Sequence, residues 1–231
     1  MMDVPQSSRQ TTPEEQAFYS YISHDPVLSH FLETGNVQNN AQFTPNKILK
    51  DPRFLRFISP VFEDVFTSAV IQCFRTGNTG MMSDIMANPI LLDDEYQERS
   101  YCTILTFLQA KQQKLITIRN NLQLKHKIKP SDMEQQAGNT IITLLNYLPD
   151  EFQGLRSEYC NELVKITKLL VKTDYNMAFE LISNARQLNC LPQSLRRAEE
   201  CYCELQNMEA NDKHLRPTFV LFRYILAFSK K

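Results

Sequence analysis

The sequence predicts an all-α protein, and three observations support this fold class. Glycine accounts for only 5 of the 231 residues. Average usage of about 7% would give roughly 16, so the hairpin turns and phosphate-binding loops that need positive backbone angles should be few. Several prolines follow helix-capping residues, and continuous strand-like alternation is absent. We expect about nine to eleven helices in a multi-helix array with a long central helix and a C-terminal helical-hairpin layer.

Helices in the N-terminal third are expected to begin at prolines. In each case an oxygen-bearing residue precedes the proline, which suits the first helical position because it has no amide to satisfy. The pairs are Thr12-Pro13, Asp25-Pro26, Thr44-Pro45, Asp51-Pro52 and Ser59-Pro60. They predict helices over 13–24, 26–34, 45–50, 52–58 and 60–76. Gly35 and Gly77 are expected to end two of these helices.

The longest helix is expected over residues 93–128, which contain neither glycine nor proline. Three acidic residues, Asp93, Asp94 and Glu95, open it, and a lysine-rich run closes it, an arrangement that favours the helix dipole. Its apolar residues recur at steps of three and four. At 1.5 Å per residue this helix would extend over ~50 Å.

Further helices are expected in the C-terminal half. Ser131 and Glu134 have the spacing of a capping box and predict a helix over 131–148. The remaining helices are predicted over 149–172, 174–188, 193–210 and 217–229. The most apolar segment, Pro217–Phe228, is shorter than the ~20 residues of a membrane span and carries Arg223, which favours a buried helix.

Composition and chain breaks indicate the domain organisation. With 42% hydrophobic and 22% charged residues and a net charge of -1, the chain is not a disordered tail, a collagen-like fibre or a polybasic nucleic-acid wrapper. The pattern breaks near 78–92, at Gly80 and Asn88-Pro89. We therefore expect a flexible N-terminus over 1–12, short proline-capped helices over 13–88 and a long-helix array over 89–231. One continuous domain over 13–231 is the alternative.

The expected location is cytoplasmic. The polar segment Met1–Thr12 lacks the basic start and apolar run of a secretory signal. The six cysteines do not have the spacing of a small disulfide scaffold, so we interpret them as reduced thiols that are mostly buried.

One segment resembles a known helical repeat. Residues 173–188 read T-D-Y-N-M-A-F-E-L-I-S-N-A-R-Q-L and are similar to the second helix of a tetratricopeptide repeat. The positions that match are Asp174, Tyr175, Ala178, Ile182, Ala185 and Leu188. Thr173 stands where the family has glycine, and residues 159–172 depart further, with Lys165 and Ile166 in place of Leu and Gly. The resemblance implies a helical hairpin and a protein partner.

A second resemblance lies upstream. The runs Ile48–Phe54 and Ile85–Pro89 contain an Asp-Pro and an Asn-Pro pair between apolar residues. They are similar to the short helix breaks of small co-chaperone helical domains, which again implies a protein partner.

A basic stretch is the sharpest charge feature. No acidic residue occurs between Glu98 and Asp132, where the cations are Arg99, Lys111, Lys114, Arg119, Lys125, Lys127 and Lys129. A basic helix of this kind binds anionic lipid or an acidic partner, with ~1 kcal/mol per residue near an anionic membrane. These charges do not share one helical face, so a solvated helix is the alternative interpretation.

Motifs for catalysis and metal binding are missing. The sequence has no G-x-S-x-G, H-E-x-x-H or phosphate-loop pattern. Cys190, Cys201, Cys203 and His214 are of ligand type, but Cys201 and Cys203 lie about 200° apart on a helix, so buried thiols are the better interpretation. We assign no catalytic residue, metal or cofactor. An α-helical enzyme with a non-local site stays an alternative.

These observations favour a non-catalytic protein-interaction module, such as an adaptor, a co-chaperone-like protein or a regulatory factor. A protein partner is expected, and nucleic acid is not. The partner-binding candidates are Lys125, Lys127, Lys129, Tyr175, Phe179 and Arg186. The alternative to a protein partner is anionic membrane lipid, bound through the basic end of the long helix.

Overall fold

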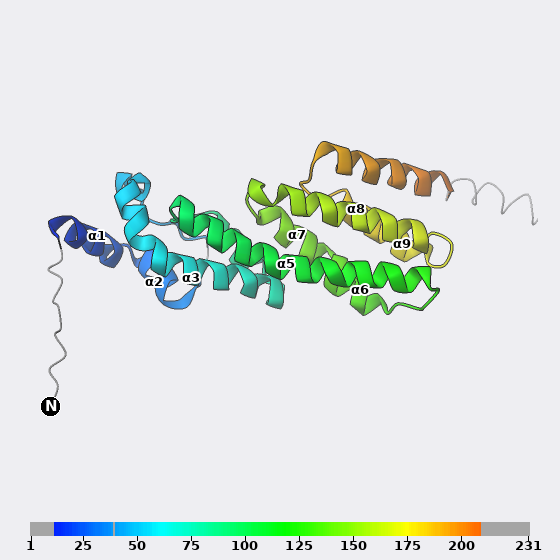
Figure 1. Ribbon diagram of the computed structural model, residues 1–231, viewed down its shortest axis with the longest axis horizontal. Helices are drawn as coiled ribbons and strands as arrows, with labels where there is room; N and C mark the ends of the chain where they lie inside the picture. The colour runs from blue at the N-terminus through cyan, green and yellow to red at the C-terminus, as the bar shows by residue number, and fades with distance from the viewer. Residues whose placement is uncertain (1–11, 39, 209–231) are drawn as a thin grey trace, which may run out of the picture. The chain divides into compact units, whose positions relative to one another are not determined.

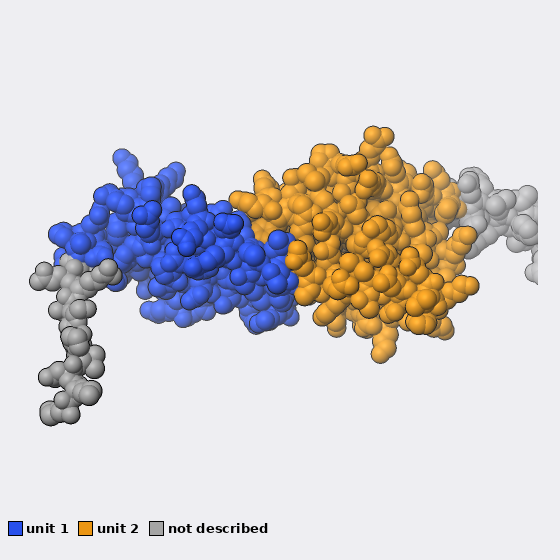
Figure 2. All heavy atoms as spheres, in the orientation of Figure 1, with its two compact units in different colours: residues 1–107 blue, residues 108–231 orange. Residues whose placement is uncertain are grey.

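The computed structural model describes residues 12–38 and 40–208, and in these residues all regular secondary structure is helical (Figure 1). Packing divides the chain into two compact units, residues 1–107 (unit 1) and 108–231 (unit 2), which Figure 2 shows in different colours. The division falls within the longest helix, α5 (Asp94–Gln123), which has 30 residues. The structure confirms the all-α fold class and its long helix. Apart from Thr12, the predicted segments 1–12 and 217–229 lie outside the described residues.

Three helices of unit 1 begin at the predicted caps Thr12, Asp25 and Asp51, whereas Asn46 and Asn78 cap two further elements at positions that were not predicted. Its elements before α5 are α1 (Pro13–His24), α2 (Pro26–Thr34), the 3-10 turn η1 (Lys47–Lys50), α3 (Pro52–Thr76) and α4 (Thr79–Met86). Thr12 and Glu15 form a complete capping box at α1. Gly35 and Gly77 end α2 and α3 in the left-handed region, as predicted, with φ of 70° and 71°. The helix expected over 45–50 is only the turn η1.

The two helices expected over 52–58 and 60–76 are one helix, because Pro60 lies inside α3. Proline removes one hydrogen bond from the helix. The neighbouring Ser59 hydroxyl bonds the Leu55 carbonyl at 2.7 Å and accepts the Asp93 amide at 2.7 Å. One buried stripe runs past the proline on both sides, formed by Phe54, Ile58, Phe62 and Phe66. Packing of this continuous apolar face therefore keeps α3 a single helix.

Two buried polar side chains hold the loop between α2 and α3 in unit 1. Asp25 caps α2 and also accepts the Thr44 amide at 2.7 Å. Asn88 accepts the Phe43 amide at 2.7 Å and donates to the Ala41 carbonyl at 3.1 Å. A residue that the sequence marks as a helix break thus satisfies buried backbone groups of a distant loop.

Unit 2 contains the C-terminal half of α5 and a set of shorter helices. They are α6 (Pro130–Ala137), α7 (Asn139–Tyr147), the 3-10 turn η2 (Asp150–Phe152), α8 (Gln153–Leu170), α9 (Tyr175–Ala185) and a helix over residues 192–208. α8 and α9 pack against each other as a helical hairpin. The two alanines of the tetratricopeptide-like segment, Ala178 and Ala185, are fully buried, so neighbouring backbones approach α9 closely.

Several helix boundaries in unit 2 differ from the prediction. The helix expected over 131–148 is split, because Gly138 adopts an extended conformation (φ -67°, ψ 164°) between α6 and α7. α6 begins at Pro130, so Ser131 lies inside the helix and forms no cap. α5 ends at Gln123 instead of residue 128, because Lys125 is left-handed with φ of 60°.

The end of α5 is a Schellman motif. The Lys125 amide donates to the Leu122 carbonyl at 2.9 Å, and the His126 amide donates to the Asn121 carbonyl at 2.9 Å. These bonds satisfy carbonyls that the helix end would leave unpaired. Glycine is the usual residue at the left-handed position, so the sequence gives no sign of this stop.

A buried arginine of α8 donates to backbone carbonyls at the neighbouring helix ends. Arg156 is fully buried, and its guanidinium donates to the carbonyls of Leu148 at 2.8 Å, Pro149 at 3.1 Å and Asn189 at 2.5 Å. Burial lowers the pKa of this guanidinium. The end of α7 and the segment after α9 are therefore fixed to the same side chain.

Candidate functional site

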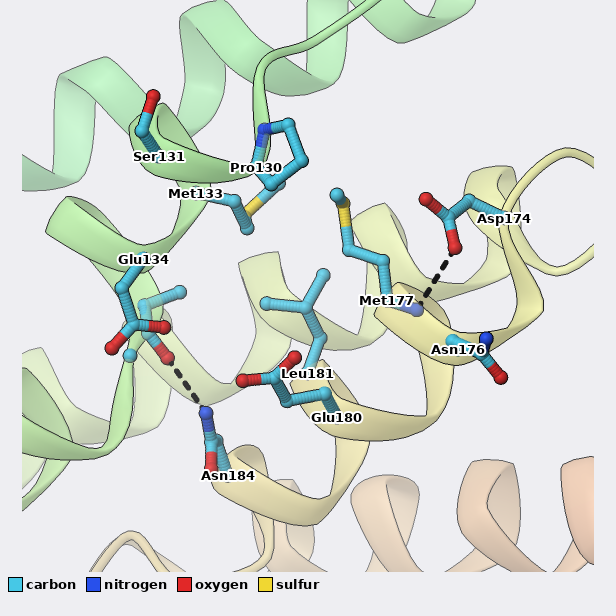
Figure 3. Close-up of a pocket in the computed structure, with 12 residues that line it drawn as sticks. Pro130, Ser131, Met133, Glu134, Asp174, Asn176, Met177, Glu180, Leu181 and Asn184 are labelled. Atoms are coloured by element: carbon cyan, nitrogen blue, oxygen red, sulfur yellow. Dashed lines mark hydrogen bonds between the residues drawn. The ribbon is translucent and has the colours of Figure 1, made fainter.

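A groove of about 480 Å³ lies between α6 and α9 in unit 2 (Figure 3). α6 and the Gly138 turn form one wall, and α9 with its capping residue forms the other. The lining residues are Pro130, Ser131, Met133, Glu134, Ala137, Gly138, Asp174, Asn176, Met177, Glu180, Leu181 and Asn184. All of them belong to unit 2.

The floor of the groove is apolar. Met133 and Leu181 are each 3% exposed, and Ala137 is fully buried. Met177 is half-buried. Figure 3 shows the side chains of Met133 and Met177 pointing toward one another from α6 and α9. Thioether side chains are flexible and polarizable, so such a floor adapts to apolar side chains of different shape.

Three exposed carboxylates, Glu134, Asp174 and Glu180, surround this floor, and no cation lines the groove. Figure 3 shows Glu134 and Glu180 facing each other across it. Within residues 12–38 and 40–208, none of the three forms an ion pair. Glu162 in the same unit, by contrast, pairs with Arg119 at 2.6 Å. The groove therefore presents three carboxylates without ion pairs in the described residues around an apolar floor.

The walls of the groove are held by side-chain bonds to backbone groups. Asn184 on α9 donates to the Ala137 carbonyl at 3.0 Å, and Asp174 accepts the Met177 amide at 3.1 Å as the cap of α9. On the far side of α6, the Tyr159 hydroxyl donates to the Gln136 carbonyl at 2.5 Å. Burial raises the pKa of this phenol, so it stays a donor at neutral pH. These bonds position the carboxylates on fixed helices.

Three predicted partner-binding residues, two on α9 and one directly after it, lie together on another face, against the helix over 192–208. The rings of Phe179 and Tyr202 are 5.2 Å apart, and the guanidinium of Arg186 lies 3.8 Å from the centre of the Tyr202 ring. Tyr175 donates to the Leu205 carbonyl at 2.9 Å. In the structure this face joins two helices of the same unit, and its role in binding a partner stays a prediction.

The three predicted lysines lie in the connection between α5 and α6. Lys125, Lys127 and Lys129 are all exposed and lie beyond the last residue of α5. Two other cations of the basic stretch are compensated, because Arg99 pairs with Glu63 at 2.5 Å and Arg119 pairs with Glu162. The structure thus places the lysines in a loop next to the groove and the α9 candidates at a helix contact.

A second hollow, of about 590 Å³, lies in unit 1 among α2, α3 and α4. Its charged lining residues are Glu33, Asp64 and Arg75, so both signs are present. Arg75 also lies 5.7 Å from the centre of the Phe107 ring. The lining of this hollow therefore carries charges of both signs.

The described part of the chain contains no group of three His, Cys, Asp or Glu side chains that could hold a metal ion. Cys201 is buried and Cys203 is exposed, as their angular separation on a helix requires. His214 lies outside the described residues. No helix among the described residues is long and apolar enough to span a membrane.

Sequence reasoning missed the groove residues Glu134, Met177 and Glu180. Their separation in the sequence hides their proximity, and the capping interpretation of Glu134 gave it a local role. Comparison of the chain with protein-family models, with curated proteins and with solved structures gives no match.

Proposed function

We propose that this chain is a non-catalytic helical protein-interaction module that binds a cationic, apolar peptide segment in the groove between α6 and α9. One observation carries the proposal: three carboxylates without ion pairs in the described residues surround an apolar floor. A partner with Lys or Arg on either side of a Leu, Met or Phe anchor complements both features.

The two features contribute differently to binding. Each exposed ion pair adds only about 0.2–1 kcal/mol, and salt screens it. An apolar anchor that is buried on the methionine floor adds about 25 cal/mol per Å² of surface removed from water. We therefore expect the anchor to supply most of the affinity, while the carboxylates set orientation and select cationic segments.

The test is a binding titration of the full chain with a fluorescent designed peptide. The peptide is a short amphipathic helix of Leu and Lys, and fluorescence anisotropy measures its binding. The double variant Glu134→Lys/Glu180→Lys should weaken binding at least tenfold. The control Glu98→Lys/Glu204→Lys makes the same change in net charge at exposed glutamates outside the groove and should bind within about twofold of the wild type.

Three results would contradict the proposal. The first is no binding to the wild type, and the second is an equal loss in both double variants, which would mean that the peptide responds to net charge alone. The third result concerns lipid. The wild type would bind phosphatidylserine vesicles but not the peptide, and the variant Lys125→Glu/Lys127→Glu/Lys129→Glu would lose the vesicle binding. That result would favour a membrane surface as the partner.

A further inference from the structure

We propose that residues 213–231 of this same chain occupy the groove between α6 and α9 and compete there with the external partner. The inference rests on the proposed function, because it names a regulator of the same site. The occupant is a C-terminal segment that lies outside the described residues.

Charge complementarity is the first argument. The segment contains five Lys and Arg residues and no Asp or Glu, and these cations are Lys213, Arg216, Arg223, Lys230 and Lys231. The groove is lined by three carboxylates and by no cation. The segment is therefore cationic, and the residues that line the groove carry only negative charge. Salt screens the attraction between them little at contact distance.

The apolar pattern is the second argument. The sequence predicts a buried helix over 217–229, and a buried helix needs an apolar surface to cover it. The run from Phe219 to Phe228 supplies large anchors on either side of Arg223. The groove offers Met133, Met177 and Leu181 as its floor, between carboxylates that suit the flanking cations. This is the same combination of anchor and charge that the proposed partner needs.

The course of the chain is the third argument. The helix over 192–208 runs antiparallel to α9, because Arg186 pairs with Glu199 while Tyr175 bonds Leu205. The last described residues therefore lie at the beginning of α9. Asp174 and Asn176, the two neighbours of Tyr175 in the sequence, both line the groove.

The link between the last described residue and the segment has a known maximum length. From Met208 to Lys213 there are five peptide steps, which span up to roughly 17 Å when extended. A short tether gives an effective concentration on the order of 1 mM. A segment that binds the groove with a Kd of ~0.1 mM would then weaken the apparent affinity of a competitor by about tenfold.

Zero-length carbodiimide cross-linking of the full chain tests where the segment lies, because it joins an amine only to a carboxylate in contact with it. Mass spectrometry of the monomer should find bonds from Lys213, Lys230 or Lys231 to Glu134, Asp174 or Glu180. The variant Glu134→Gln/Glu180→Gln should lose most of them. The matched control Glu98→Gln/Glu204→Gln should keep them.

A second measurement tests competition. The full-length variant Arg216→Glu/Arg223→Glu should lose the cross-links and should bind the designed Leu/Lys peptide about tenfold more tightly than the wild type. Equal affinity of both proteins, together with no cross-links to the groove, would overturn the inference and leave the proposed function standing. Cross-links without any peptide binding would support the inference and refute the proposed function.

Other occupants give distinct outcomes, and each would overturn the inference. Cross-links between ¹⁴N- and ¹⁵N-labelled chains in a mixed sample would show that a second copy supplies the segment. A lipid surface is the other possible occupant. In that case the wild type would bind phosphatidylserine vesicles, the variant Arg216→Glu/Arg223→Glu would lose this binding, and no cross-links to the groove would form in the absence of vesicles.

Discussion

An alanine at Gly138 should destabilise unit 2, because the turn between α6 and α7 has no room for a side chain. A Cβ atom built there would lie 2.6 Å from the Glu134 carbonyl oxygen and still closer to the Glu134 carboxylate. The flexible side chain can move away, but the carbonyl belongs to the last turn of α6 and accepts the Gly138 amide at 2.9 Å. Relief of the clash therefore requires the backbone of the turn to shift.

The magnitude follows from two opposing terms. Overpacking of a fitted site costs about 1–3 kcal/mol. The φ of -67° at Gly138 suits any residue, so alanine recovers about 0.4–1 kcal/mol through the lower entropy of the unfolded chain. We expect Gly138→Ala to lower the free energy of unfolding by about 1–2 kcal/mol, which corresponds to a fall in Tm of about 2–8 °C.

Gly154→Ala is the matched control. Gly154 lies in the first turn of α8, and a Cβ there would have no heavy atom within 4 Å. The same substitution should therefore stabilise unit 2 by about 0.5–1 kcal/mol, since alanine is the better helix former. Circular dichroism at 222 nm during heating, and urea titration, measure both variants. An unchanged or increased stability of Gly138→Ala would refute the steric reasoning.

Three further predictions use other features of the two units. Lys125→Gly should raise the free energy of unfolding by about 1 kcal/mol in urea titration, because glycine adopts the left-handed conformation without strain; a loss of stability would contradict the Schellman interpretation. Tyr159→Phe should cost about 1–3 kcal/mol in the same assay, because the buried Gln136 carbonyl loses its donor; an unchanged midpoint would show that the bond is immaterial. Mass spectrometry after brief iodoacetamide treatment should find label on the two exposed thiols, Cys102 and Cys203, and not on the four buried ones; early labelling of a buried thiol would contradict the packing.

The external partner and the C-terminal segment are expected to use the groove in the same way. Gly138→Ala provides a link between stability and binding, because Gly138 and Glu134 both line the groove. A shift of the turn would change the position of the Glu134 carboxylate relative to that of Glu180. We therefore expect Gly138→Ala to weaken binding of the designed peptide as well, whereas Gly154→Ala should leave it unchanged.

Local chemistry explains what the sequence alone determined. The caps at Thr12, Asp25 and Asp51 and the stops at Gly35 and Gly77 act within one helical turn, so residue type and spacing predict them. The all-α class follows from the same short-range signals. Composition and charge also excluded several classes of protein without any knowledge of packing.

Tertiary packing decided the boundaries and the site. Pro60 stays inside α3 because the apolar stripe on both sides of it is buried, and Lys125 adopts a conformation that usually belongs to glycine. Glu134 of α6 and Glu180 of α9 line the same groove, although the two helices are far apart in the chain. Such a site depends on how helices fold back on one another. Sequence periodicity reports the face of a single helix and carries no information on which other helix that face will meet.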